Sequence, residues 1–471
     1  MLGTMYDLAI IGGGPGGYVA AISAARHGMK VLLIEKDRIG GTCLNRGCIP
    51  TKSFYYDAKL FHAARTSTVL KGNDSLSVDP MGMLTRKRQV VSSLHAGLDH
   101  AIRSHGVTIT AGTGELVSPQ QIRIASAGAE PYLVKVGQVI LATGSQPAVP
   151  AAIHVDGYRV QTTDQALDCE EIPQRVAIIG GGVIGLEMAA IYLNLGCQVR
   201  IIELLPDILV TEDADIRKAM RQLLLKRGAA LHLQSQVLEV AEGGAGTTVV
   251  FRTGSGDVHR EAADRVLVAT GRAPVVAGID AVRIGLKMDG RFVHVDDGFR
   301  TNLPGVYAIG DVIGGMMLAH KATAEAEAAV ANLRGDRRSV KQARVPRCIW
   351  GLSEIGAIGL SEEQAVAAGR RVKVGRFPYM ASGAAHALGA TEGFVKVVGD
   401  PDSGEILGVH IIGAHATDLI SEASTAMALE SFVEDLSEAI KPHPTLSETV
   451  SEAALSWRNM AIHLPASGVS P

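Results

Sequence analysis

Short apolar runs alternate with glycine turns and helical patterns along most of the chain. The first run covers residues 6–11, ends in the turn Gly12–Gly17 and leads into a helical pattern at 18–27 and a second apolar run at 31–35. Short apolar runs bounded by glycine turns suit strands, and a helical pattern between two of them suits a strand–helix–strand unit. The pattern therefore predicts a βαβ unit at the start of the chain.

The same pattern recurs farther along. Residues 175–179 form an apolar run, the turn Gly180–Gly185 follows, and the next run ends at Glu203. Each unit is also followed by a run that ends in Ala-Thr-Gly, at 142–144 and at 269–271. The repeat predicts an α/β fold with two Rossmann-like, dinucleotide-binding domains.

Each glycine turn has the spacing of a dinucleotide fingerprint. The first glycine makes the tight bend, the second lets a pyrophosphate approach and the third lets the helix pack on the strand. In both units an acidic residue ends the second strand 23 residues after the first glycine, where it accepts hydrogen bonds from a ribose diol. Two such sites predict two nucleotides and electron transfer between them. The residues are Gly12, Gly14, Gly17 and Glu35 in the first unit, and Gly180, Gly182, Gly185 and Glu203 in the second.

The rest of the chain divides at proline-containing crossings. Residues 144–150 and 272–274 are predicted linkers. A strand pattern then ends in Asp311, whose carboxylate suits a sugar-like hydroxyl chain or, alternatively, a helix N-cap. We expect a dinucleotide-binding domain at 1–145 and 272–343, a second at 146–271, and an α+β interface domain at 344–471.

The expected elements of the later segments have weaker patterns. An alanine-rich helix is predicted at 317–334, and the last domain combines strands with two helices and has no nucleotide turn. The strands predicted there are 357–360, 394–398 and 406–413.

Cys43 and Cys48 lie directly behind the first nucleotide-binding unit. A disulfide needs Cα atoms within about 7 Å, whereas positions five apart on a regular helix point roughly 140° apart. Gly47 relaxes the backbone between the sulfurs and Pro50 removes a helical donor after them, so we interpret the pair as a redox-active disulfide. A metal site, a structural disulfide and two unconnected thiols are the alternatives, although no second ligand pair at metal spacing is present in the sequence.

Composition excludes several classes of function. The chain has 471 residues, 47% of them hydrophobic and 20% charged, with a net charge of −3. These values suit a globular protein of about three domains that has no bulk attraction to nucleic acid or anionic membranes. The three cysteines outside the pair form no disulfide scaffold, so we expect a reducing, cytoplasmic compartment. Residues 8–25 are uncharged, but their strand–turn–helix pattern argues against a signal peptide or membrane span.

A histidine near the C-terminus stands between two prolines. Pro442 and Pro444 hold His443 in rigid, non-helical backbone. Glu448 follows at a predicted helix start, where it can hold the ring. For an isolated residue of this kind a surface histidine is the default interpretation, and an oriented acid-base group is the alternative.

Together these motifs resemble the dihydrolipoamide dehydrogenase family of dimeric flavoprotein disulfide reductases, and the resemblance runs nearly end to end. The segments that carry it are 12–17, 41–52, 180–185, 310–311, 317–321, 408–413 and 443–448.

The resemblance implies FAD in the first site and NAD in the second. Cys43 would be the sulfur that exchanges with the substrate, and Cys48 the sulfur that lies against the flavin. His443, oriented by Glu448, would act as the acid-base group at the disulfide of the other subunit of a homodimer. The implied FAD-site residues are Gly12, Gly14, Gly17, Glu35, Lys52, Thr143, Gly144, Asp311, Met317, Leu318, Ala319 and His320, and the implied NAD-site residues are Gly180, Gly182, Gly185, Glu187, Glu203 and Gly271. Lys52 and Glu187 match a charged pair near the reactive edge of the flavin.

The implied reaction is the NAD-dependent oxidation of dihydrolipoamide carried by lipoyl domains of a 2-oxoacid dehydrogenase or glycine cleavage complex. The rivals are a glutathione- or mercuric-reductase-like enzyme and a nucleotide-binding subunit without turnover. Glu203 disfavours NADPH because its carboxylate repels a 2′-phosphate, and the sequence lacks the terminal cysteine pair of mercuric reductases. Residues 54–56, Trp350 and Lys441 depart from the family pattern and leave the disulfide substrate open.

Overall fold

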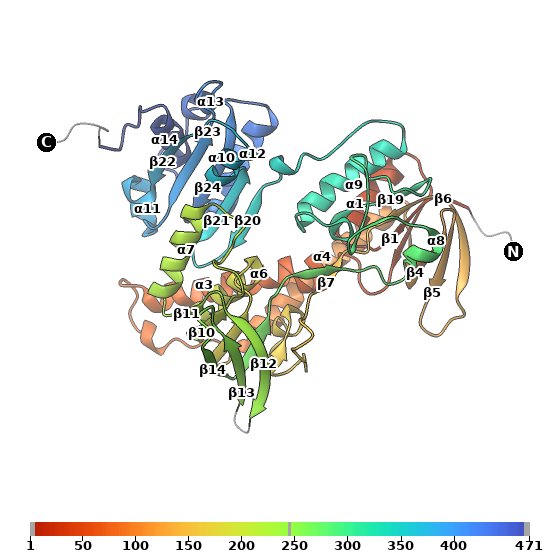
Figure 1. Ribbon diagram of the computed structural model, residues 1–471, viewed down its shortest axis with the longest axis horizontal. Helices are drawn as coiled ribbons and strands as arrows, with labels where there is room; N and C mark the ends of the chain where they lie inside the picture. Colours follow the sequence, from red (N-terminus) through yellow and green to blue (C-terminus); the bar gives the residue numbers. More distant parts are fainter. Residues whose placement is uncertain (1–4, 244–245, 466–471) are drawn as a thin grey trace.

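The computed structural model describes residues 5–243 and 246–465. Figure 1 shows three lobes, each built around its own sheet, with the C-terminal lobe in blue. We call them the first lobe, which contains strand β1 (Tyr6–Ile11), the second lobe, which contains β9 (Arg175–Ile179), and the C-terminal lobe. Two Rossmann-like lobes followed by an α+β lobe confirm the fold class predicted from the sequence.

The first lobe has a seven-stranded sheet covered by helices. Its further elements are α1 Pro15–Arg26, β2 Val31–Glu35, β3 Thr108–Ala111, β4 Thr113–Ser118, β5 Gln121–Ala125, β6 Tyr132–Leu141, α8 Ala281–Ile284, β17 Met288–Asp289, β18 Phe292–Val293, β19 Val306–Ala308, η2 Gly310–Ile313 and α9 Ala319–Leu333. The strand order is β3-β2-β1-β6-β5-β4, with β19 beside β6. Leu8 and Ile10 of β1 pack into the core that contains α1 and α9, and Ala9 and Ile11 pack into the core on the other face. A central parallel strand buried on both faces explains the continuous apolar run.

The second lobe repeats this arrangement and adds a three-stranded antiparallel sheet. Its further elements are β8 Val160–Gln161, α5 Thr163–Ala166, α6 Val183–Asn194, β10 Gln198–Ile202, α7 Ala214–Lys226, β11 Ala230–His232, β12 Gln236–Gly243, β13 Gly246–Arg252, β14 Val258–Ala263 and β15 Arg265–Val268. The parallel sheet has the order β11-β10-β9-β15-β8. β9 therefore occupies the central place that β1 has in the first lobe, and the second glycine turn begins at its carboxyl end.

The two predicted linkers lie side by side. β7 (Ser145–Pro147) leads toward the second lobe and β16 (Arg272–Pro274) leads out of it, and the two pair as an antiparallel ladder. The second lobe is thus an insertion whose entry and exit share one crossing point.

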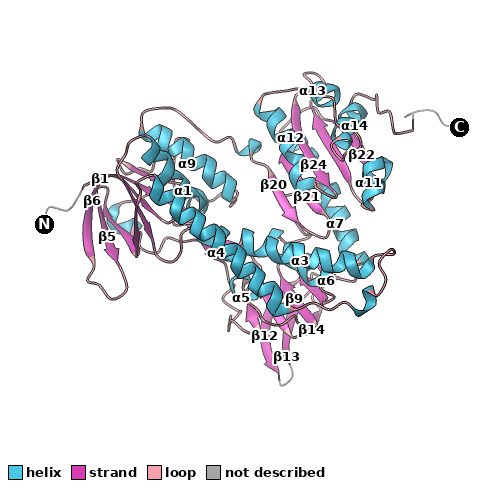
Figure 2. Cartoon of the chain, turned by 180° about the vertical axis from the view of Figure 1, so that it is seen from behind, coloured by secondary structure: helices cyan, strands magenta, loops and turns pink. Residues whose placement is uncertain are grey.

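Three helices between β2 and β3 join the lobes. They are α2 Gly41–Arg46, α3 Cys48–Thr66 and α4 Pro80–Ser104, with the short turn η1 Asn73–Ser75 before α4. Tyr55 and Ala58 of α3 are buried in the same core cluster as α6 residues of the second lobe. Figure 2 shows α3 and α4 side by side along that lobe. The segment that carries the cysteines is therefore fixed to the second lobe.

The C-terminal lobe is an antiparallel sheet with helices. Its elements are η3 Gln342–Arg344, β20 Arg347–Trp350, β21 Glu354–Gly359, α10 Glu362–Ala367, β22 Lys373–Pro378, η4 Tyr379–Ala381, α11 Gly383–Leu388, β23 Phe394–Gly399, β24 Ile406–Ile412, α12 Ala416–Ala428, α13 Val433–Glu438 and α14 Glu448–Trp457. The strand order is β20-β21-β24-β23-β22. The prediction of two helices was too low, because three of the five α-helices span six residues each. Ile349, Ile355 and Ile412 also pack into the second lobe's core. Within the described residues, no helix is long and apolar enough to cross a membrane.

Candidate functional site

The two glycine turns require residues without a side chain. Gly12 has a φ of 106° and Gly180 a φ of 113°, a region that L-residues rarely adopt. A Cβ on Gly17 would overlap the carbonyl of Gly12, and a Cβ on Gly185 would overlap the carbonyl of Gly180. The first and third glycines of each fingerprint therefore allow the helix to begin directly against the strand end.

The acidic residue of each unit binds the backbone of its own glycine turn. The Glu35 carboxylate accepts hydrogen bonds from the N–H groups of Gly13 at 2.6 Å and Asp37 at 2.8 Å. Glu203 accepts from the N–H groups of Gly181 and of Leu205, the latter at 2.7 Å. Burial raises the pKa of the Glu35 carboxyl, and the Gly13 N–H opposes that shift. Each acid thus shapes the turn as well as presenting oxygens to a ribose.

A cavity of about 770 Å³ opens beside the first turn. It reaches from Glu35 at the end of β2, past the start of α1, to the cysteines and to Glu187 on α6. No side chain caps α1, so its first N–H groups face an anion-binding position. The predicted FAD-site residues that line the cavity are Gly12, Gly14, Glu35, Lys52, Thr143, Gly144, Asp311, Met317 and Ala319. An elongated cavity with a glycine cradle and a ribose acid at one end fits FAD.

Three predicted FAD-site residues are not among the residues that line the cavity. Gly17 packs under the turn, Leu318 is the residue before α9, and His320 places Nε2 2.7 Å from the carbonyl oxygen of Pro346. Of the predicted NAD-site residues, Glu187 lines the cavity. Gly180, Gly182, Gly185, Glu203 and Gly271 are not among its lining residues and lie at the carboxyl edge of the second sheet.

Asp311 faces the cavity from the turn η2. The turn is held because the Gly310 N–H donates to Glu325 at 2.8 Å, and Glu325 forms a buried ion pair with Lys321 at 2.5 Å. Asp311 lies within the turn, so it is not the N-cap residue that the alternative interpretation required. Its carboxylate accepts a hydrogen bond from the hydroxyl of Ser145.

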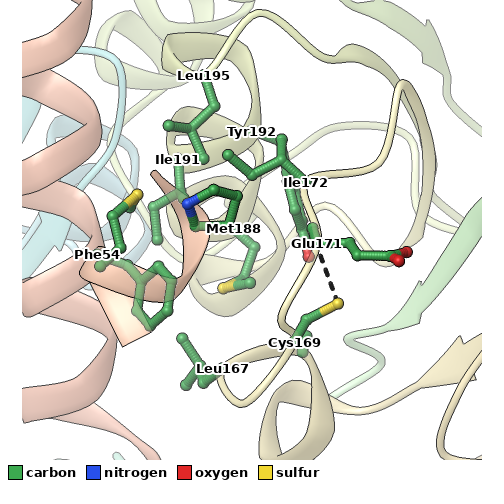
Figure 3. Close-up of a pocket in the computed structure, with 12 residues that line it drawn as sticks. Phe54, Leu167, Cys169, Glu171, Ile172, Met188, Ile191, Tyr192 and Leu195 are labelled. Carbon is green, nitrogen blue, oxygen red and sulfur yellow. Dashed lines mark hydrogen bonds between the residues drawn. The ribbon is translucent and has the colours of Figure 1, made fainter. Parts of the chain in front are cut away.

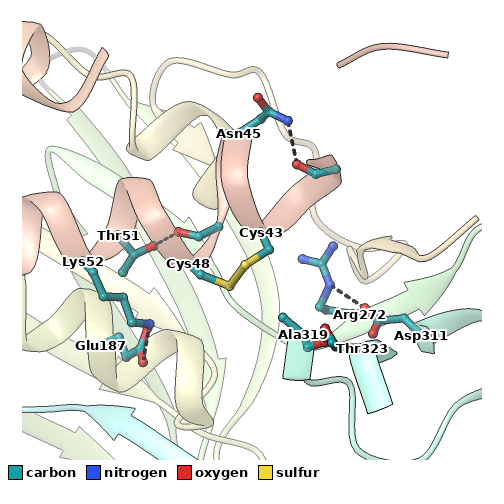
Figure 4. The surroundings of a disulfide bond; sticks show 12 residues. Cys43, Asn45, Cys48, Thr51, Lys52, Glu187, Arg272, Asp311, Ala319 and Thr323 are labelled. Atoms are coloured by element: carbon teal, nitrogen blue, oxygen red, sulfur yellow. Dashed lines mark hydrogen bonds and ion pairs between the residues drawn. A yellow bond between two sulfur atoms is a disulfide. The ribbon is translucent and has the colours of Figure 1, made fainter. Parts of the chain in front are cut away.

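Arg272 and Ser145 also belong to this site, although neither was predicted from the sequence. Arg272 Nε donates to the Ser145 hydroxyl at 2.6 Å. The same Nε lies 3.9 Å from the Asp311 carboxylate (Figure 4). Burial lowers the pKa of the Arg272 guanidinium, and Asp311 opposes that shift. Both residues line the cavity and belong to the paired linkers. The only sequence signal was their position directly after the two Ala-Thr-Gly motifs.

Cys43 and Cys48 form a disulfide in the cavity wall (Figure 4). The helix is interrupted at Gly47, whose φ of −129° and ψ of −106° separate α2 from α3 and bring the two Cα atoms to 4.7 Å. The Thr51 hydroxyl donates to the Gly47 carbonyl at 2.6 Å and supports this break. Within the described residues, no group of three or more potential ligands is placed to hold a metal ion.

A charged pair lies one helical turn beyond the disulfide. Lys52 Nζ donates to the two carboxylate oxygens of Glu187 at 2.9 and 2.8 Å. The pair joins α3 to α6, and both residues line the cavity (Figure 4). A fixed ion pair in a cavity wall can set the local potential felt by a nearby redox group.

His443 lies in the C-terminal lobe, away from this cavity. Its Nδ1 is 2.9 Å from Glu448 Oε1, while Glu448 Oε2 accepts the Thr445 N–H at 2.9 Å. The hydrogen bond with His443 holds the pKa of the Glu448 carboxyl below its usual value. The imidazole is 79% exposed, so its Nε2 is open to a group outside the chain.

The bulky residues after the disulfide pack inward for the most part. Phe54 lines a small pocket of about 30 Å³ between α3 and α6, together with Met188, Tyr192 and Cys169 (Figure 3). Tyr55 is fully buried, whereas Tyr56 is half exposed. Phe54 and Tyr55 therefore contribute to the packing of α3, and of these three residues only Tyr56 remains at the surface.

Comparisons with known proteins agree with this geometry. Residues 6–326 match the family model described as pyridine nucleotide-disulphide oxidoreductase, and residues 345–454 match the dimerisation domain of that family.

Relatives match over nearly the full chain. A dihydrolipoyl dehydrogenase of Bacillus subtilis is 38% identical to this chain, and the match covers 98% of this chain and 100% of the relative. A dihydrolipoyl dehydrogenase of Zymomonas mobilis is 36% identical, and the match covers 97% of this chain and 99% of the relative. A leghemoglobin reductase of Vigna unguiculata is 38% identical, and the match covers 96% of this chain and 87% of the relative. The crystal structure of LpdA from Mycobacterium tuberculosis superposes with a TM-score of 0.89 at 26% identity, over 96% of this chain and 99% of the other.

Proposed function

Because the chain belongs to the pyridine nucleotide-disulphide oxidoreductases, we propose that it is a dihydrolipoyl dehydrogenase that oxidises protein-bound dihydrolipoamide and reduces NAD. The observation that carries the proposal is the Cys43–Cys48 disulfide in the wall of the cavity that also holds Glu35 and Asp311. A reducible bond therefore lies within the site that fits FAD.

The cofactors divide between the lobes. Segments 1–145 and 272–343 hold FAD, segment 146–271 holds NAD, and segment 344–471 forms the dimer. Glu35 binds the adenosine ribose of FAD and Asp311 its ribityl chain, while Glu203 binds the ribose of NAD and repels a 2′-phosphate. The chemistry that bound FAD supplies is transfer of the electron pair from the enzyme dithiol to NAD.

The thiol chemistry belongs to the chain's own residues. A substrate thiolate attacks Cys43, breaks the disulfide and leaves Cys48 as a thiolate; the second substrate thiolate then closes the product disulfide and releases Cys43. The partner's His443 takes the thiol proton because only the thiolate is nucleophilic. Glu448 orients the ring through its 2.9 Å contact and stabilises the imidazolium.

The same geometry suggests the partners. The His443–Glu448 pair is exposed and lies apart from the disulfide of its own chain, which favours a homodimer with sites shared between subunits. The relatives are named dihydrolipoyl dehydrogenases, which supports a lipoyl dithiol as the substrate. We propose that these lipoyl groups are carried by a 2-oxoacid dehydrogenase or glycine cleavage complex.

A steady-state comparison tests the proposal. The purified protein is expected to be yellow and to reduce NAD with dihydrolipoamide much faster than it oxidises NADPH with glutathione disulfide. Cys48→Ser is the control, because it removes the disulfide and leaves the glycine cradle unchanged. A colourless protein, or a preference for glutathione disulfide and NADPH, would overturn the proposal.

A further inference from the structure

Strand β20 brings an aromatic ring from the C-terminal lobe onto the Lys52–Glu187 pair. The Lys52 ammonium lies 4.3 Å from the centroid of the Trp350 ring. The backbone N–H of Trp350 donates to Glu187 Oε1 at 3.2 Å. One residue thus contacts both members of the pair, the cation through its ring and the carboxylate through its backbone.

These contacts leave the ammonium little freedom. The Glu187 carboxylate takes hydrogen bonds from Lys52 on one side, and the electron-rich ring face attracts the same cation. The Lys52 side chain is 21% exposed and that of Glu187 is 8% exposed, so water competes weakly for either charge. Loss of the ring would release the ammonium toward solvent.

The position of the Trp350 ring leaves one of its polar groups without a hydrogen bond. The indole N–H of Trp350 is buried and has no hydrogen-bond partner among the described residues. Buried indole N–H groups usually find an acceptor. The contact with Lys52 and the packing of the ring against the second lobe's core therefore account for its position.

Lys52 connects this contact to the disulfide. It follows Cys48 by four residues on α3, which places the two side chains on the same helix face. Both line the cavity, whereas Trp350 does not. An ammonium held in the same cavity wall as a newly formed thiolate stabilises the reduced pair.

We propose that Trp350 is a positioning residue that holds the Lys52 ammonium in the cavity wall, one helical turn beyond Cys48, and so raises the reduction potential of the Cys43–Cys48 disulfide. The inference rests on the proposed function only in treating the disulfide as redox-active. It assigns to the C-terminal lobe a second task besides dimerisation, namely control of the redox pair within its own chain.

The test compares Trp350→Leu with Trp350→Phe, which keeps an aromatic face. The holoenzyme is equilibrated with dithiothreitol redox buffers and alkylated, and the Cys43 and Cys48 thiols are counted by mass spectrometry. Trp350→Leu should favour the oxidised form threefold to tenfold, where tenfold equals about 30 mV for a two-electron couple. Trp350→Phe should remain within threefold of the wild type. Trp350→Met gives the same comparison if the leucine variant does not fold.

A double-mutant cycle separates positioning from general packing. In a Lys52→Met background, Trp350→Leu should no longer shift the potential, because the charge through which it acts is gone. Trp457→Phe is the matched control, since this second tryptophan contacts Lys373 at 5.0 Å in the C-terminal lobe, and its loss should leave the potential unchanged.

The outcomes distinguish this inference from the proposed function. A wild-type potential in Trp350→Leu, or an equal shift with and without Lys52, overturns the positioning role even if lipoamide turnover is normal. The thiol count uses neither lipoamide nor NAD, so the expected shift supports the role even in a protein that fails the lipoamide assay.

Discussion

Mixed dimers provide the sharpest test of where His443 acts. Cys48→Ser chains and His443→Gln chains should each lose activity, the second by about 10² to 10⁴, the usual range for a positioned acid-base group. The two lesions lie in different lobes. Figures 1 and 2 both show α13 and α14, which flank His443, in a different lobe from α3, which begins at Cys48.

The magnitude follows from the shared site. In a dimer of one Cys48→Ser chain and one His443→Gln chain, one site combines both lesions and the other combines the intact disulfide with the intact histidine. Random reassociation of equal amounts makes half of the dimers mixed, so total activity should return to about one quarter of the wild type. Purified mixed dimers should have about half the wild-type activity per dimer.

The assay is NAD reduction by dihydrolipoamide after the two variants are unfolded together and refolded. The matched control mixes Cys48→Ser with Cys43→Ser, because every disulfide in those dimers is broken and no site can recover. The contrary result is that verified mixed dimers of Cys48→Ser and His443→Gln chains are as inactive as the two parent variants. In that case His443 does not act on the disulfide of the partner subunit.

Three further outcomes are expected. Glu203→Ala should lower kcat/KM for NAD about tenfold to a hundredfold, because one hydrogen bond to a charged group is lost, and kcat/KM for NADP should change less. An unchanged ratio of the two kcat/KM values would mean that another residue discriminates between NAD and NADP. Cys48→Ser should abolish lipoamide turnover, but the variant should still bind FAD and NADH should still reduce it, as absorbance spectra of the flavin would show. Lipoamide turnover in this variant would mean that the cysteines take no part in the reaction. Burial lowers the pKa of His410 below 6.5, so the unfolded chain takes up the proton first and the free energy of unfolding should fall as pH drops below about 6.5. Urea unfolding at pH 7.5 and 5.5 should show a smaller fall in His410→Gln, and an equal fall in both proteins would remove His410 as a contributor.

Local patterns predicted the elements that carry the nucleotide turns. β1, β2 and β9 begin and end where the apolar runs do, since strands buried on both faces contain few polar residues. α1 begins at Pro15, three residues before the predicted helix, because a proline is well placed in a first helical turn. The break at Gly47 also follows from sequence, since two cysteines five apart cannot pair on a regular helix.

The contacts between distant segments had no such signal. Arg272 meets Ser145 across 127 positions, and Lys52 meets Glu187 across 135, so neither pairing changes the local periodicity. The Lys52–Glu187 pair was expected only from the family resemblance. Helices of six residues, such as α10 and α11, are shorter than two turns and leave no readable apolar stripe. These features depend on how the lobes assemble, which a single sequence does not encode locally.

The ladder formed by β7 and β16 has a consequence for engineering and descent. In its register Pro147 lies opposite Arg272 and Ser145 opposite Pro274, so the chain departs and returns through neighbouring positions. An insert with adjoining ends can be exchanged as a cassette when the new insert keeps the face that packs on Tyr55 of α3 and the carboxylate that binds Lys52. Substituting the corresponding stretch of an NADPH-dependent relative between these strands would change the pyridine nucleotide while the thiol chemistry stays in place.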